Sequence, residues 1–258
     1  MSLPRFIQIH TLHNYPAALL NRDDAGLAKR LPYGDAVRTR ISSQCLKRHW
    51  RKADDQHALA RLGVPMAVRS RVTLDLIRRE LIGQGLSETD AQTAAEGLRA
   101  AGLLDNGKDL KGQEALETGQ AVLLGHAEID YLVRRCAELA RDMGHTADTS
   151  ETPDPKAYKA AIAAFLRDEK KNIAEIRHGS GLESALFGRM VTSDVLASRD
   201  AAVYVAHAFT VHEAQVENDY FTVVDDLLRD AGEVGSAGIF DTELASGLYY
   251  GYVVVDVP

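Results

Sequence analysis

The stretch Arg38-Thr-Arg-Ile-Ser-Ser-Gln-Cys-Leu-Lys-Arg-His-Trp-Arg51 decides the fold of this 258-residue chain. Its first four residues predict a short strand. Ser42 or Ser43 then provides the N-cap of a helix that extends to about Ala60, because a serine oxygen accepts a hydrogen bond from a free backbone N–H. Leu46 and Trp50 lie four residues apart and predict the buried face of this helix. The stretch therefore indicates a strand that leads directly into a helix.

Outward from this stretch, β-rich segments lie near both ends of the chain and helical periodicity fills the middle. The predicted strands are 6–12, 201–212 and 247–257, and the predicted helical segments lie between 69 and 144, including 112–143, and at 156–178. Strands separated by a long helical insertion are typical of an α+β fold with appendages on an antiparallel sheet.

Charge is distributed unevenly along the chain, whose formal net charge is -7. Residues 1–52 contain ten Lys and Arg against three Asp, an excess of seven positive charges. The remaining residues contain 20 basic and 34 acidic side chains, an excess of 14 negative charges. Because local fields decide what a groove attracts, the basic first fifth is the candidate surface for a polyanion.

The start of the predicted helix has the chemistry of a phosphate site. A helix N-terminus offers free backbone N–H groups and the positive end of the helix dipole. Ser42, Ser43 and Gln44 add side-chain donors there, and Lys47 and Arg51 extend the positive surface along one face. A sugar-phosphate backbone could cross such a helix start, although the same residues also fit a solvated basic face.

Sequence support for catalysis is weak. The pairs Asp23–Asp24 and Asp225–Asp226 are adjacent in sequence, so their side chains point apart in extended chain. His207 and His212 are five residues apart on a predicted strand and do not suit a shared zinc ion. No Gly-x-Ser-x-Gly elbow, phosphate-binding glycine loop or dinucleotide fingerprint occurs. We expect a protein that is not an enzyme and that needs no cofactor and no metal.

The same composition bears on location. Two cysteines, Cys45 and Cys136, do not make a disulfide framework and fit a reducing compartment. No apolar run approaches the roughly 20 residues that cross a bilayer, and the chain begins without a basic segment followed by an apolar one. We therefore expect a cytoplasmic protein with no membrane partner.

Three apolar side chains near predicted turns, Met190, Phe221 and Ile239, are unusual in their polar surroundings. Such side chains can wedge between bases or contact a neighbouring molecule. Ordinary packing beneath a loop is the alternative.

Several motifs, in the same order as in one known family, run the length of the chain. Asn21-Arg-Asp-Asp24 precedes Arg40-Ile-Ser-Ser-Gln-Cys-Leu-Lys-Arg48, and Gly188-Arg-Met-Val-Thr-Ser193 follows the helical region. Ala206-His-Ala208, Phe221-Thr-Val-Val-Asp-Asp226 and Ser246-Gly-Leu-Tyr-Tyr250 complete the series. Together they resemble the backbone subunit of the type I-E CRISPR Cascade complex, the CasC or Cas-seven family.

The resemblance implies a hand-shaped α+β fold with an RRM-like (ferredoxin-like) antiparallel palm. The palm would comprise residues 1–60 and 179–258, with a thumb hairpin at about 213–246. A helical fingers insertion would occupy 61–178. Members of the family continue past the point where this chain ends, so the chain would lack the C-terminal part of the palm.

The resemblance also implies a function: a non-catalytic subunit that oligomerises along the guide RNA and supports target-DNA recognition in antiviral defence. Its partners would be CRISPR RNA, the target DNA paired to it, copies of itself arranged head to tail and other Cascade subunits. The RNA-binding residues would be Arg22, Arg40, Ser42, Ser43, Gln44, Lys47, Arg48, Arg51, Arg189, Met190, Phe221 and Ile239.

Two alternatives remain open. Backbone subunits of type III complexes resemble this family in fold, and there a loop aspartate cleaves target RNA with a divalent ion. Asp23 or Asp24 would take that role here. The other alternative is a protein-only scaffold whose basic helix contacts an acidic partner.

Overall fold

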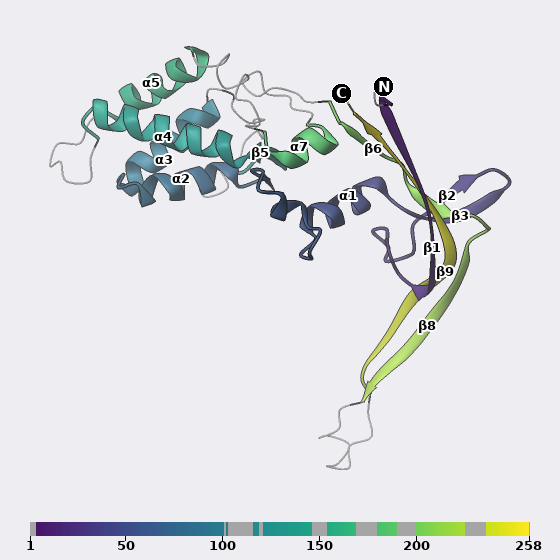
Figure 1. Cartoon of the computed structure of the whole chain (residues 1–258). Helices are drawn as coiled ribbons and strands as arrows, with labels where there is room; N and C mark the ends of the chain where they lie inside the picture. Colours follow the sequence, from purple (N-terminus) through teal and green to yellow (C-terminus); the bar gives the residue numbers. More distant parts are fainter. Residues whose placement is uncertain are drawn as a thin grey trace. The chain divides into compact units, whose positions relative to one another are not determined.

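The computed structural model describes residues 4–100, 102, 116–118, 121–145, 154–168, 180–189, 200–224 and 236–257. The chain forms two compact units. A sheet unit comprises Met1–Ala53 and Val203–Pro258, and a helical unit comprises Asp54–Ala202. The predicted combination of helices with an antiparallel sheet is confirmed (Figure 1).

Among its described residues, the sheet unit contains seven antiparallel strands and one helix, α1. The strands are β1 (Phe6–Ala18), β2 (Arg30–Tyr33), β3 (Ala36–Ile41), β6 (Val203–Val205), β7 (Ala208–Thr210), β8 (Gln215–Val224) and β9 (Ser236–Asp256). The main sheet has the order β1-β9-β7-β3-β2, and β6 and β8 also pair with β9. The long strand β9 therefore joins the sheet to the extended β8–β9 hairpin, as Figure 1 shows.

The two faces of the sheet differ because successive side chains of a strand point to opposite sides. One face carries the small core of the unit, in which Ile41, Ala208 and Tyr249 are buried and Leu46 of α1 packs against them. Glycine is required on this face, because a Cβ at Gly247 would lie 2.5 Å from Cγ2 of Thr210. The opposite face carries Arg40, Phe209 and Tyr250, which are paired across three strands.

Helix α1 (Ser43–Lys52) is shorter than predicted and ends where the backbone turns extended at Ala53. Leu46 contacts the core as expected. The burial predicted for Trp50 is wrong, because this side chain is 38% exposed. The positions of the strands near residues 6, 38, 201 and 247 agree with the sequence pattern, with a break at Ala206 and His207 between β6 and β7.

The helical unit contains the larger core. Its elements are the 3-10 turn η1 (Leu59–Leu62), β4 (Ala67–Ser70), α2 (Thr73–Gly83), α3 (Glu88–Ala100), β5 (Val122–Gly125), α4 (His126–Asp142), α5 (Pro155–Asp168) and α7 (Leu182–Phe187). Apolar residues at helical spacing on α2, α3, α4 and α5 form one buried cluster. Gly97 allows α3 to approach α5, because a Cβ there would lie 3.2 Å from Ile162.

Two predictions for this region are corrected. Residues 122–125 form a strand rather than helix, because they pair antiparallel with β4. The part of 180–202 that is described belongs to the helical unit, whereas the resemblance placed 179–202 in the palm. There Leu182 N donates to Pro65 O, and Ala67 N donates to the buried Glu183 carboxylate. In the described residues, no helix is both long and apolar enough to span a membrane.

Candidate nucleic-acid interface

A depression of about 690 Å³ lies on the sheet unit beside the start of α1. Its lining residues come from β2, β3, the start of α1 and the break between β6 and β7, and they are Lys29, Arg30, Leu31, Pro32, Arg40, Ser42, Gln44 and His207. We call it the basic groove. Arg40, Ser42 and Gln44 are close together in sequence, and the pairing of β3 with β7 brings the distant His207 to them.

The positive charge of the basic groove is only partly compensated. Arg30 forms an ion pair with the buried carboxylate of Glu243. Arg40 contacts an uncharged backbone oxygen, Arg30 O at 3.3 Å, and a ring nitrogen of His207 at 3.2 Å. Within the part of the chain that the structure describes, neither Lys29 nor Arg40 has a carboxylate partner. Two cationic side chains are therefore available to an anion in the groove.

Glu243 was not predicted from the sequence, yet it organises the groove. One carboxylate oxygen accepts a hydrogen bond from Ala28 N at 2.8 Å, and the other pairs with Arg30. A strand of the hairpin thus holds the segment that carries Lys29 against the sheet. A single acidic residue on an acidic strand gives no sequence pattern by which this role could be recognised.

The Asn21–Asp24 motif forms a loop that supports the same site. Asp23 Oδ1 accepts hydrogen bonds from Ala25 N and Leu27 N, each at 2.9 Å, and so closes its own turn. Asn21 Oδ1 accepts a hydrogen bond from Ser42 N at 2.9 Å and ties the loop to the start of α1. Arg22 is exposed on this loop.

The helix start is less open to an anion than we expected. Ser42 is buried and caps α1, since its Oγ accepts a hydrogen bond from Cys45 N. Ser43 N donates to His207 Nδ1 at 3.1 Å. The expectation of free backbone donors is therefore corrected for Ser43 and Cys45, whose N–H groups have partners inside the protein. The described contacts give Ser42 a capping role.

The exposed side of α1 continues from the groove. Gln44 lines the groove, and Lys47, Arg48 and Arg51 follow it at intervals of three, four and seven residues. Residues with these spacings lie on one side of a helix. Cys45 and Leu46 contact the core instead. The predicted basic side chains of α1 thus lie on the same side of the helix as Gln44, which lines the groove.

His207 is held neutral by its surroundings. Burial lowers the pKa of its imidazole, and the positive charges of Arg40 and Lys29 lower it further. Because Nδ1 accepts the hydrogen bond from Ser43 N, the proton of the neutral ring is on Nε2. The ring therefore accepts a hydrogen bond from the helix start through one nitrogen and offers a donor through the other.

The titration of His207 gives a first prediction. We expect its imidazole, followed by NMR, to titrate below the ordinary value of about 6.5. A polyanion in the groove should raise this pKa, because it offsets the charges of Arg40 and Lys29.

Since the folded-state pKa is lowered, the contribution of His207 to stability is present above about pH 6.5 and is lost as the pH falls through the lowered value. In the His207→Gln variant, the melting temperature should fall less on acidification than it does in the wild-type protein. A midpoint at or above the ordinary value would contradict this account.

On the β8–β9 hairpin, Phe221 pairs in register with Phe240. Their rings are stacked, with centroids 5.6 Å apart, and they are 44% and 50% exposed. Phe221 is thus an exposed aromatic side chain, as predicted. Ile239 pairs in register with Thr222, but its side chain lies outside the described residues, as does all of Met190.

Arg189 is placed away from any surface. It is 4% exposed, and its two terminal nitrogens donate to the two carboxylate oxygens of Glu128 at 2.6 and 2.9 Å. Nη1 also donates to Leu123 O. The predicted contact of Arg189 with RNA is therefore corrected: its guanidinium stabilises the interior of the helical unit.

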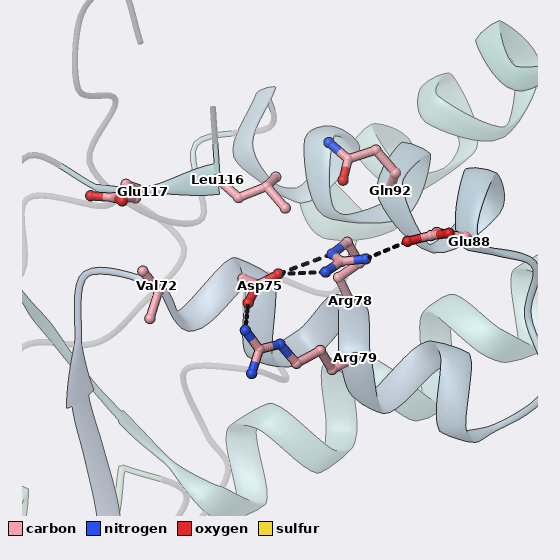
Figure 2. A pocket seen from close by; sticks show the side chains of 8 residues that line it. All are labelled: Val72, Asp75, Arg78, Arg79, Glu88, Gln92, Leu116 and Glu117. Atoms are coloured by element: carbon pink, nitrogen blue, oxygen red, sulfur yellow. Dashed lines mark hydrogen bonds and ion pairs between the residues drawn. The ribbon is translucent and has the colours of Figure 1, made fainter. Parts of the chain in front are cut away.

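A second pocket, of about 410 Å³, lies on the helical unit (Figure 2). Figure 2 shows Asp75 between Arg78 and Arg79, with ion-pair distances of 2.8 and 2.6 Å, and Glu88 on the far side of Arg78. Here the cations already have carboxylate partners, unlike Lys29 and Arg40. The described residues contain no cluster of three or more His, Cys, Asp or Glu that could hold a metal ion.

The fold and the site define a protein of mixed α and β structure, with an antiparallel sheet and, in its described residues, a basic groove whose charge is only partly compensated. A family model described as CT1975-like protein matches residues 7–258. The chain therefore belongs to the CT1975-like protein family.

The chain also resembles solved structures. A chain of a CRISPR RNA-guided surveillance complex in a pre-nicking state is 30% identical, with a TM-score of 0.70 over 97% of this chain and 64% of that chain. A chain of another CRISPR RNA-guided surveillance complex is 26% identical, with a TM-score of 0.61 over 97% of this chain and 63% of that chain. This chain thus spans about 64% of the length of these relatives. No curated protein matches it. The predicted kinship with chains of CRISPR surveillance complexes is confirmed.

Proposed function

We propose that this chain is a non-catalytic, guide-RNA-binding backbone subunit of a type I-E CRISPR Cascade complex, of the CasC type. The observation that carries the proposal is the basic groove, in which Lys29 and Arg40 have no carboxylate partner among the described residues. The relatives with the same fold are chains of RNA-guided complexes, which supports RNA as the anion.

In this role the sheet unit is the RRM-like palm, the β8–β9 hairpin is the thumb and the helical unit is the fingers. Copies lie head to tail along the CRISPR RNA in the cytoplasm, with the other Cascade subunits at the ends of the row. A head-to-tail contact that does not close suits an extended polymer. The protein holds the RNA backbone, and target DNA is recognised by base pairing with the guide.

The proposal that the protein is not a nuclease is supported by Asp23. Its carboxylate accepts hydrogen bonds from the backbone of its own turn and so has a structural role. It is tested by incubating the assembled complex with RNA complementary to the guide and with Mg²⁺ or Mn²⁺. We expect the RNA to stay intact. Cleavage at regular intervals that disappears in Asp24→Ala would instead identify a metal-dependent nuclease of the type III kind.

RNA binding itself is tested with the complex purified after co-expression of its partner subunits and a guide transcript. We expect a discrete RNA of guide length, protected at regular intervals. Nucleic-acid-free material that binds no added single-stranded RNA would favour the protein-only scaffold.

A second prediction concerns the exposed side of α1. Lys47→Ala combined with Arg51→Ala should reduce the slope of log affinity against log salt by about 1.4, because each phosphate contact on a single strand contributes about 0.7. Affinity at physiological salt should fall roughly tenfold. Fluorescence anisotropy with a labelled single-stranded RNA measures both quantities. Arg61→Ala with Arg141→Ala, the same change of charge on the helical unit, is the control. An unchanged slope in the α1 variant would show that these side chains do not contact phosphate.

A further inference from the structure

The face of the sheet opposite the core carries a continuous set of rings. Register places His10 opposite Tyr252, and Phe209 opposite Tyr250. Tyr33 of β2 extends the set to the far edge of the sheet, where its ring lies 4.8 Å from that of Phe209. We call Tyr33, Phe209, Tyr250, His10 and Tyr252 the aromatic row.

Neighbouring rings of the row are in contact. Phe209 and Tyr250 have centroids 6.0 Å apart, as do Tyr250 and His10, and His10 and Tyr252 are 4.9 Å apart. The row crosses the sheet from β2 to β1, four strand spacings or about 19 Å. A surface of this length can contact several successive groups of a bound polymer.

Hydrogen bonds at the ring edges hold the row in place. The hydroxyl of Tyr250 lies 2.8 Å from Nδ1 of His10, and the hydroxyl of Tyr252 donates to Oε1 of Gln8 at 3.1 Å. The guanidinium of Arg38 lies 5.8 Å from the centre of the Tyr33 ring and donates to Tyr33 O. Rings that are fixed before binding lose little side-chain entropy when a ligand stacks on them.

The row is also exposed and lies beside positive charge. Tyr33 is 57% exposed, and the other four rings are partly or largely accessible. Arg40 pairs in register with Phe209, so the aromatic row and the basic groove lie on the same face of the sheet. Aromatic rings adjoining a cationic groove are the arrangement with which proteins bind single-stranded nucleic acid, the rings contacting bases and the cations contacting phosphates.

We propose that the aromatic row is a base-stacking surface for single-stranded RNA whose phosphates occupy the basic groove. The inference rests on the proposed function and adds a second mode of contact to it. The exposed side chains of this surface are aromatic rather than aliphatic. The surface adjoins the basic groove, where Lys29 and Arg40 have no carboxylate partner among the described residues. Both features favour a nucleic acid over the apolar surface of another protein subunit.

The test compares two probes and three proteins. The probes are a single-stranded RNA oligomer and an abasic phosphodiester of the same length. The proteins are wild type, Tyr33→Leu/Tyr252→Leu, and the matched control Tyr33→Phe/Tyr252→Phe, which keeps both rings. Affinity is measured over a range of salt concentrations, and the stacking of 2-aminopurine placed in the RNA is followed by its fluorescence.

We expect wild type to bind the RNA about 100-fold more tightly than the abasic probe, at roughly tenfold for each stacked base. The leucine variant should lose most of this preference and the quenching of 2-aminopurine, with an unchanged salt slope. The phenylalanine variant should keep both.

Three results would overturn the proposal. If wild type bound both probes equally, no base would be stacked, and this comparison does not depend on the folding of any variant. If the leucine variant kept the full preference, other side chains would stack the bases. If the leucine variant changed self-association in sedimentation without changing the preference, the row would be a protein interface. By contrast, absence of any salt-dependent binding by wild type would overturn the proposed function itself.

Discussion

Reversing the charge of the basic groove, with Lys29→Glu and Arg40→Glu, is expected to weaken binding of single-stranded RNA by at least about 100-fold at physiological salt. The two cations have no carboxylate partner among the described residues, so their field is directed into the groove. Removing them lowers the number of counterions released, and the introduced carboxylates repel the phosphates. The slope of log affinity against log salt should therefore fall as well.

The control for this variant is Arg61→Glu with Arg141→Glu. It changes the net charge of the chain by the same amount, but both residues lie on the helical unit. If RNA binding depends on the groove, the control should lose much less affinity. Equal losses in the two variants would show that only net charge matters, and the groove would then not be the site.

Glu128→Ala should destabilise the helical unit by about 3–5 kcal/mol, because it leaves the buried guanidinium of Arg189 without its counter-charge. The substitution also removes the acceptor for Gly125 N, which closes the first turn of α4 at 3.0 Å. Urea denaturation followed by the circular dichroism of the helices measures the loss.

Two further variants separate the causes. Glu128→Leu with Arg189→Met removes both charges and should recover part of the loss, since an apolar pair avoids the desolvation of isolated ions. Glu138→Ala removes a carboxylate whose ion pair with Arg135 is about one-third exposed, and should cost about 1 kcal/mol or less. A Glu128→Ala variant as stable as Glu138→Ala would show that the buried pair contributes little.

The sequence predicted the elements whose pattern is local. The alternation of apolar and polar residues near 6 and 247 predicts strands, and the structure has β1 and β9 there. A serine followed by helical spacing predicts the start of α1. The pattern could not distinguish strand from helix at Val122–Gly125, because a short apolar run fits both and its pairing with β4 depends on residues more than 50 positions away.

The sequence predicts Arg40 as a candidate site residue but not Lys29, and it does not identify the residues that support the groove. Lys47, Arg48 and Arg51 follow from spacing on one helix. Asn21, His207 and Glu243 act through contacts with distant segments, so no local pattern identifies their roles. Arg189 shows the converse: as a basic residue in a family motif it predicts an RNA contact, whereas in the structure it is buried and donates to the Glu128 carboxylate.

The continuity of β9 bears on how this protein can change in length. Its residues 236–246 pair with β8, and its residues 245–256 pair with β1. Because side chains alternate along a strand, one residue inserted between Ala245 and Asp256 would exchange the two faces beyond it. An insertion before Tyr250 would turn Tyr250 and Tyr252 toward the core, and Val253 would take a place on the face that carries the rings. Insertions and deletions of a single residue are therefore excluded from the second half of the strand, residues 245–256, where they would change the register with β1.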